Sequence, residues 1–168
     1  MTDTLTTASP IDLLPTGLLI DGEWRDATDG ATFDVLDPAT GECLLAIADA
    51  TAADGLAAIE AARAAKQSWA RTTARQRADI LQRTSQRLVA DKERLAFIMT
   101  REMGKPLADA RGEVQYAADF FRWFAEEAVR ISGTHAVAPD GRGQILTVRE
   151  PVGPTLLITP WNFPLAMG

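Results

Sequence analysis

The apolar positions in the first third of the chain follow short runs typical of β-strands. Residues 18–24 place apolar side chains on both sides of Asp21-Gly22, a pair that favours the positive φ angles of a type I′ turn. Residues 33–36 and 43–47 are two further apolar runs, and residues 37–41 between them carry the Pro and Gly of a turn. The pattern predicts a small antiparallel β layer.

From Thr51 onward the apolar spacing becomes helical and predicts four helices. Thr51 with Asp54 forms the pattern of a capping box at the start of the first helix. We place the starts of the second and third helices near Thr73 and Asp91, and residues 104–106 (Gly-Lys-Pro) end the third. The fourth is predicted to stop at Ser132-Gly133. Apolar residues at spacings of three and four are predicted to face the core: Leu56, Ile59, Ala62, Ala65, Trp69, Leu81, Thr84, Leu88, Leu95, Ile98, Met99, Val114, Ala117, Phe121, Phe124, Ala128 and Ile131.

The last third of the chain predicts two strands after a Gly-rich loop at residues 140–143. Residues 145–148 alternate in polarity, whereas residues 153–158 are continuously apolar, as in a parallel strand buried on both faces. A parallel sheet needs further βα units. We therefore expect a truncated α/β fold: a small antiparallel β layer, a helical block and the first buried strand of a Rossmann-like sheet. Residues 1–15 are interpreted as a flexible leader, and residues 16–168 as part of one domain.

Composition and charge exclude several function classes. The 168 residues are 46% hydrophobic and carry a net charge of −6, and the basic residues are dispersed, which argues against nucleic-acid binding. One Cys and one His cannot build a disulfide framework or a clustered metal site. No apolar run is long enough to cross a membrane, and the N-terminus lacks the features of a secretory signal, so we expect a cytoplasmic protein.

Asn162 is the strongest candidate for chemistry. It follows the predicted buried strand, and α/β folds bind ligands at that edge of the sheet. Its side-chain amide can donate a hydrogen bond to a developing oxyanion, and Pro160 and Pro164 restrict the backbone around it. The alternative is a turn asparagine that caps its own backbone, but the unusual composition of residues 159–164 favours function. Trp161 is a candidate for packing against a cofactor.

Other candidates have simpler interpretations. Cys43 has no neighbouring cationic residue in the sequence to lower its pKa, so we interpret it as a small buried hydrophobic residue. His135 is expected on the surface or in a loop. The pair Gly141 and Gly143 precedes a predicted strand instead of opening a helix, so it is interpreted as a turn and not a dinucleotide fingerprint.

Acidic and aromatic residues of the last helices are mostly interpreted as solvated faces and core. The acidic residues assigned to solvated faces are Glu102, Asp109, Glu113, Glu126 and Glu127. Phe120 and Trp123 lie off the apolar stripe of the fourth helix, which leaves open whether one of them faces a partner or a substrate passage.

Several motifs together resemble the aldehyde dehydrogenase superfamily. Residues 159–164 (Thr-Pro-Trp-Asn-Phe-Pro) resemble its signature turn, and the resemblance extends from about Leu18 to the end of the chain. The other segments that carry it are residues 20–24, 37–42, 102–107, 110–117 and 150–153. Residues 102–117 with residues 123–127 look most like succinate-semialdehyde dehydrogenases.

The resemblance implies roles for residues around the turn. Such enzymes oxidise an aldehyde to an acid with NAD or NADP, through a cysteine nucleophile and a glutamate base. The residue matching Asn162 donates to the substrate oxygen, and the residue matching Phe163 lines the substrate tunnel. Residues of about 136–150 would belong to an oligomerisation element of a homodimer or homotetramer. The positions implied to contact the cofactor are Ile158, Thr159, Pro160, Trp161 and Asn162.

The nucleophile, the base and the Gly-rich cofactor turn of the family would lie downstream of this turn, and none is present. We therefore expect residues 16–168 to be the N-terminal portion of an NAD(P)-binding domain, without the catalytic domain and inactive by itself. The parent enzyme is expected to convert a small semialdehyde, succinate semialdehyde, to succinate. Glutarate semialdehyde is an alternative substrate. A function of a different class, a non-catalytic helical interaction module, also remains open. No metal, nucleic acid or membrane partner is expected.

Overall fold

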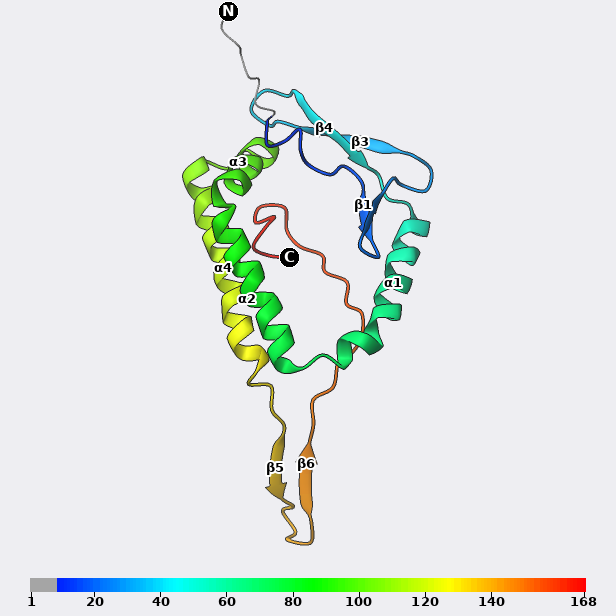
Figure 1. Ribbon diagram of the computed structural model, residues 1–168, viewed down its shortest axis with the longest axis vertical. Helices are drawn as coiled ribbons and strands as arrows, with labels where there is room; N and C mark the ends of the chain where they lie inside the picture. Colours follow the sequence, from blue (N-terminus) through cyan, green and yellow to red (C-terminus); the bar gives the residue numbers. More distant parts are fainter. Residues whose placement is uncertain (1–8) are drawn as a thin grey trace, which may run out of the picture.

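The computed structural model describes residues 9–168 and contains four helices and three separate antiparallel hairpins (Figure 1). This confirms the α/β class with small antiparallel sheets and a helical block. The elements are β1 (Leu18–Ile20), β2 (Glu23–Arg25), β3 (Thr32–Leu36), β4 (Cys43–Ala48), α1 (Ala52–Ala70), α2 (Ala74–Ala90), α3 (Lys92–Met103), α4 (Leu107–Ala128), β5 (Thr134–Val137) and β6 (Gln144–Thr147).

The first two hairpins form where the sequence predicts them. Asp21 and Gly22 have φ angles of 55° and 81°, as a type I′ turn requires, and β1 pairs with β2 around them. β3 pairs with β4, with a bulge between Val35 and Leu36. The two hairpins are separate two-stranded sheets, so the β layer consists of two small units.

The predicted starts of α1 and α2 are confirmed by their capping boxes, whereas α3 begins after Asp91 without a side-chain cap. Thr51 accepts from the backbone N–H of Asp54 at 3.3 Å, and the Asp54 carboxylate accepts from the backbone N–H of Thr51 at 2.8 Å. Thr73 and Gln76 form the same reciprocal pair at α2. Asp54 also accepts from the hydroxyl of Thr28 at 2.6 Å, which connects α1 to the loop between β2 and β3. These hydrogen bonds, led by that of the Thr28 hydroxyl, lower the pKa of Asp54 well below its usual range.

The core lies among α2, α3 and α4. Its buried residues are Ala96, Met99, Ala110 and Val114, and Leu88, Leu95 and Leu165 pack against them. The predicted core stripe of the fourth helix is wrong at its C-terminal end, because α4 ends at Ala128 and Phe124 and Ile131 are 54% and 61% exposed. Small side chains, Ala117, Ala118 and Ala125, are buried instead. They allow close helix packing, which leaves the bulky residues on an uncovered face.

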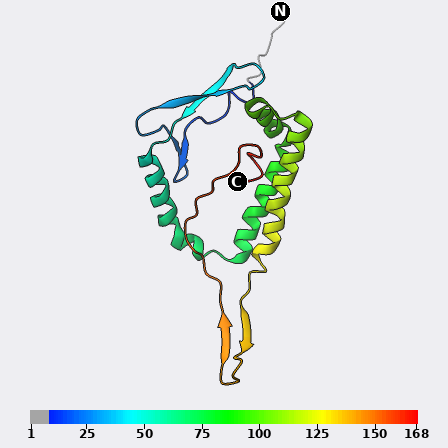
Figure 2. The ribbon, with the colours of Figure 1, turned by 180° about the vertical axis from the view of Figure 1, so that it is seen from behind.

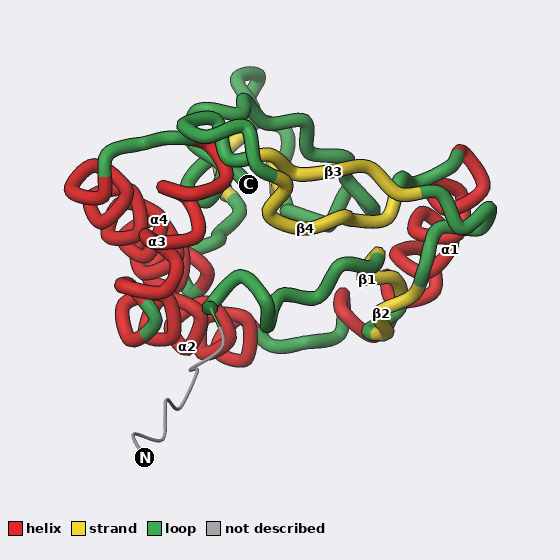
Figure 3. The backbone as a smooth tube through the Cα atoms, turned by 90° about the horizontal axis from the view of Figure 1, so that it is seen from above, coloured by secondary structure: helices red, strands yellow, loops and turns green. Residues whose placement is uncertain are grey.

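Helix α1 stands apart from the other helices. In Figures 1 and 3 it lies opposite the block of α2, α3 and α4. Its predicted inner face is therefore wrong within this chain: Leu56, Ile59 and Trp69 are 65%, 51% and 48% exposed. The accessible surface of the chain is 12508 Å², whereas about 8,000 Å² is expected for a compact monomer of this mass. Large apolar faces are thus uncovered in this chain.

The C-terminal part contains a projecting hairpin and an extended segment. β5, which the sequence pattern missed, pairs with β6 around the predicted turn at residues 140–143, and Figure 2 shows this hairpin pointing away from the other elements. The prediction of a buried strand at residues 153–158 is wrong here: no strand forms, and Leu156 and Ile158 are 82% and 89% exposed. A strand needs hydrogen-bonding neighbours, and no described segment pairs with it.

The predicted leader is only partly described. Residues 1–8 lie outside the described residues, and residues 10–13 form a turn in which Ile11 is only 6% exposed. No helix in residues 9–168 is long and apolar enough to span a membrane. Over the same residues, no group of three or more His, Cys, Asp or Glu side chains is arranged to hold a metal ion.

Candidate active site

The turn predicted to carry chemistry lies at the end of the extended segment, between α1 and the helical block (Figures 1 and 2). Residues 161–166 form the turn, and the Met167 N–H donates to the carbonyl of Phe163 at 3.2 Å. Asn162 and Trp161 are exposed. The Asn162 side-chain amide makes no hydrogen bond to any other residue of the described chain, so this turn does not show the self-capping alternative.

The side chain of Lys105 contacts this turn. It lies in the short connection between α3 and α4, where Gly104 adopts a left-handed conformation with φ of 79°. The Lys105 Nζ donates to the backbone carbonyl of Asn162 at 2.8 Å, and lies 4.2 Å from the centroid of the Phe163 ring. The same ammonium forms an ion pair with Glu113. One buried cation thus contacts two consecutive residues of the turn.

Glu113 holds the other end of the turn. Its Oε1 accepts hydrogen bonds from the backbone N–H groups of Leu165, at 2.9 Å, and Ala166, at 3.2 Å. Its side chain is 1% exposed, so the interpretation of Glu113 as part of a solvated face is wrong. The sequence held a signal for this burial: Glu113 lies three residues after Ala110 and four before Ala117, on the apolar side of α4.

The end of α3 is clamped to the β3–β4 hairpin next to this site. Arg101 donates to the buried carboxylate of Asp37 at 2.7 Å. The backbone N–H of Ala39 and then Arg101 lower the pKa of Asp37. A Cβ atom placed on Gly104 would lie 2.9 Å from Cγ of Pro38, so the helix cap and the hairpin turn are in close contact. The backbone just before Lys105 is therefore held against the β3–β4 hairpin by these two contacts.

The remaining predicted positions lie in the turn or just before it, and all are exposed. Ile158 is 89% exposed, Thr159 and Pro160 are exposed, and Trp161 is 79% exposed. Phe163 is 38% exposed. The structure therefore brings Asn162 and its neighbours together with Lys105 and Glu113, which sequence reasoning did not single out as functional.

Cys43 and His135 lie elsewhere. Cys43 is exposed on β4, so its interpretation as a buried residue is wrong, because the β3–β4 hairpin has one face uncovered. Desolvation and the nearby Asp34 raise the pKa of the Cys43 thiol, which disfavours the thiolate form. His135 is exposed on β5, where its Nε2 lies 2.8 Å from Oε1 of Gln144, so its surface position is confirmed.

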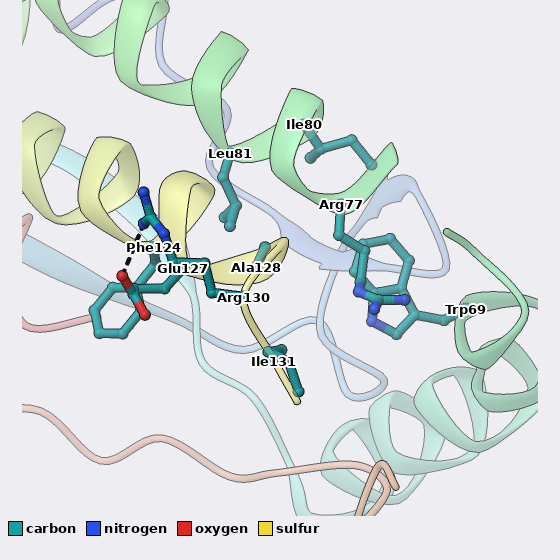
Figure 4. Close-up of a pocket in the computed structure, with 9 residues that line it drawn as sticks. All are labelled: Trp69, Arg77, Ile80, Leu81, Phe124, Glu127, Ala128, Arg130 and Ile131. Atoms are coloured by element: carbon teal, nitrogen blue, oxygen red, sulfur yellow. Dashed lines mark hydrogen bonds and ion pairs between the residues drawn. The ribbon is translucent and has the colours of Figure 1, made fainter. Parts of the chain in front are cut away.

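Two apolar pockets border the helical block. Figure 4 shows one of about 440 Å³ between the end of α1 and the helices α2 and α4, where Trp69 faces Leu81 across the space and Glu127 pairs with Arg130. No residue of the turn lines it. The other, of about 420 Å³, lies beside the turn. It is lined by Leu81, Ala117, Phe120, Phe121, Phe124, Leu165, Ala166, Met167 and Gly168.

Comparison with known proteins matches most of this chain, including the candidate turn, to one protein family. Residues 24–168 match the model of the aldehyde dehydrogenase family. The chain is 57% identical over 124 residues to the succinate-semialdehyde dehydrogenase of Paenarthrobacter nicotinovorans, covering 74% of this chain and 28% of that protein. It is 44% identical over 148 residues to the glutarate-semialdehyde dehydrogenase of Pseudomonas putida KT2440, covering 88% of this chain and 31% of that protein.

Solved structures agree with this match. The crystal structure of an E. coli NADP-dependent enzyme superposes with a TM-score of 0.89 at 42% identity, covering 93% of this chain and 32% of that one. The chain thus spans less than a third of the length of the curated relatives described above. The similarity includes the turn that carries Asn162, which lies within the matched residues.

Proposed function

The chain belongs to the aldehyde dehydrogenase family, and we propose that it is the N-terminal part of an enzyme that oxidises succinate semialdehyde to succinate with NAD or NADP. The 57% identity to one succinate-semialdehyde dehydrogenase supports succinate semialdehyde. Glutarate semialdehyde is the alternative, because a glutarate-semialdehyde dehydrogenase and the succinate-semialdehyde dehydrogenase of E. coli are both 44% identical to this chain. The observation that carries the proposal is the free amide of Asn162 on a turn held by buried contacts.

Asn162 has a defined chemical task in this proposal. When a nucleophile attacks an aldehyde, negative charge develops on the carbonyl oxygen, and an amide N–H placed beside it stabilises the tetrahedral species. The Asn162 amide is exposed and its hydrogen-bonding capacity is not used elsewhere in residues 9–168. Phe163, packed against Lys105, would present an apolar wall to the substrate chain.

The stretch before the turn suits a nucleotide cofactor. The backbone N–H and C=O groups of residues 155–160 take part in no backbone hydrogen bond within the described chain, and the side chains of Ile158 and Trp161 are exposed. Such a stretch offers polar backbone groups and apolar side chains to a bound dinucleotide. The nicotinamide would supply the hydride acceptor, while this chain supplies the surface that orients it.

The 168-residue chain is proposed to be inactive by itself. Its one cysteine, Cys43, is exposed with a raised pKa on a hairpin outside the turn, so it is unsuited to act as the nucleophile. The complete enzyme would supply the nucleophile and the base from residues outside this chain.

The projecting β5–β6 hairpin is proposed to lie in a subunit interface of a homodimer or homotetramer. Val137 and Leu146 are 66% and 73% exposed on it, and apolar side chains on a projecting hairpin are stabilised by association. Sedimentation of the complete enzyme carrying Leu146→Asp should show smaller assemblies than the unsubstituted enzyme, and an unchanged assembly would contradict this interface.

The proposed reaction is tested with the complete coding sequence that contains this chain. Formation of NADH or NADPH is measured with succinate semialdehyde and with glutarate semialdehyde, and the ratio of kcat/KM decides between the substrates. The variant Asn162→Ala should lower kcat by about 100- to 1,000-fold, as expected for loss of one oxyanion donor. Gln115→Ala, which removes an exposed amide on α4, is the matched control. Oxidation of neither substrate, or a nearly unchanged kcat for Asn162→Ala, would contradict the proposal.

A further inference from the structure

A buried ion pair lies directly beneath the candidate turn. Lys105 comes from the α3–α4 connection and Glu113 from the second turn of α4, and both contact the backbone of residues 162–166. We infer that Lys105 and Glu113 are positioning residues that fix the direction of the Asn162 amide. This inference rests on the proposed function, because it assigns the pair a role only through Asn162.

The burial of both charges points to a specific arrangement. The side chains of Lys105 and Glu113 are 11% and 1% exposed. Charged groups taken out of water need partners, and an ion pair compensates for lost hydration only when further hydrogen bonds satisfy the remaining donors and acceptors. Here Glu113 also accepts two backbone N–H groups, and Lys105 also contacts a carbonyl and an aromatic ring.

The contacts hold the turn at the Asn162 carbonyl and on the C-terminal side of that residue. Lys105 binds the carbonyl of Asn162, which orients the peptide plane after that residue. Glu113 binds the N–H groups of Leu165 and Ala166, just beyond Pro164. The main chain is thus held at and after Asn162, while its exposed side-chain amide makes no hydrogen bond within residues 9–168 and can meet a ligand.

The anchor adjoins the buried core of the helical block. Glu113 is flanked in α4 by Ala110 and Val114, which are both 0% exposed in the core. The side chain of Leu165 packs against the same core. A movement of the turn would therefore have to break core packing as well as the ion pair. This matters for catalysis because a displacement of about 1 Å at a catalytic group can cost about 100-fold in rate.

The test is a double-mutant cycle in the complete enzyme. Lys105→Met keeps an aliphatic side chain beside Phe163 but removes the ammonium, so kcat should fall by about 10- to 100-fold with little change in KM. In the Asn162→Ala background the same substitution should lower kcat by less than about 2-fold, because the group it positions is already gone. Lys105→Arg should restore part of the activity. Arg122→Met, which removes an exposed cation paired with Asp119 on α4, is the control.

Hydrogen exchange of the Leu165 and Ala166 amides distinguishes positioning from general unfolding. In Lys105→Met these amides should exchange at least about 10-fold faster, while the Val114 amide in the core should exchange at its usual rate. Unchanged exchange at Leu165 and Ala166, or a full loss of kcat from Lys105→Met in the Asn162→Ala background, would overturn the inference. If exchange responds as expected but Asn162→Ala retains full kcat, the proposed function fails and the positioning role fails with it.

Should Lys105→Met not fold, Glu113→Gln provides a second variant. It keeps an oxygen acceptor for the N–H groups of Leu165 and Ala166 and removes the charge that holds Lys105. The same cycle then applies: a drop in kcat that disappears in the Asn162→Ala background supports positioning. A drop of equal size in both backgrounds contradicts it.

Discussion

Two glycine-to-alanine substitutions, one at a helix cap and one inside a helix, should change the free energy of unfolding in opposite directions. Gly104 ends α3 with φ of 79°, a conformation that costs an L-residue about 1–2 kcal/mol. Its added Cβ would also lie 2.9 Å from Cγ of Pro38, which forces the proline ring to move. Gly112 lies inside α4, and a Cβ there would meet no atom within 4 Å.

The magnitudes follow from these two environments. For Gly104→Ala, the backbone strain and the contact with Pro38 together outweigh the lower entropy of the unfolded chain, so we expect a loss of about 1–3 kcal/mol. For Gly112→Ala, the helix interior gains the better helix former, which should stabilise the protein by about 0.5–1 kcal/mol. In a protein of this size the first change lowers Tm by roughly 3–10 °C.

Urea unfolding followed by the far-UV circular dichroism of the helices measures both changes under identical conditions. The substitutions are chemically the same, so effects of composition cancel between them. Equal shifts for the two variants, or a Gly104→Ala variant as stable as the unsubstituted protein, would refute the argument from cap geometry. In the complete enzyme, a lower kcat for Gly104→Ala would further connect the cap to Lys105, which follows it directly.

Two other predictions follow from the described contacts. Hydrogen bonds, first from Thr28 and then from Thr51, lower the pKa of Asp54 below its ordinary value of 3.8. The ionised carboxylate therefore stabilises the fold above about pH 4, and this contribution is lost as the pH falls towards the folded-state pKa. Melting curves of the protein and of Asp54→Asn should differ most near neutral pH and converge in acid, and a constant difference would contradict this. Leu156→Asp should raise the solubility of the isolated chain, because Leu156 is 82% exposed there. If residues 153–158 form a buried strand in the complete enzyme, the same substitution should prevent that enzyme from folding. A well-folded complete variant would contradict the burial.

The accuracy of the sequence-based predictions depends on how local each feature is. The hairpin turn at Asp21-Gly22 and the helix start at Thr51 were correct because backbone preferences and hydrogen bonds within three residues determine them. The stripe through Phe124 was wrong because periodicity identifies an apolar face but not the element that covers it. The strand at residues 153–158 failed for a related reason, since pairing depends on neighbouring strands.

The candidate site divides in the same way. The composition of residues 159–164 was sufficient to single out Asn162, and the resemblance of this turn and several other motifs indicated the family, which the comparisons then showed. The contacts of Lys105 and Glu113 with the turn could not be predicted from the sequence, because the partners are far apart along the chain. Lys105 is 57 residues from Asn162 in the sequence, and Glu113 is 52 residues from Leu165.

The sequence by itself thus determined the turns, the helix caps, the family and the one amide proposed to act in catalysis. Only the tertiary structure decided which charges are buried beneath that amide and which apolar faces are left uncovered. The physical reason is that turns and caps form through interactions between residues a few positions apart. Burial and ion pairing depend on which distant segments are brought together, and here the packing of α3 and α4 places one lysine and one glutamate under the turn.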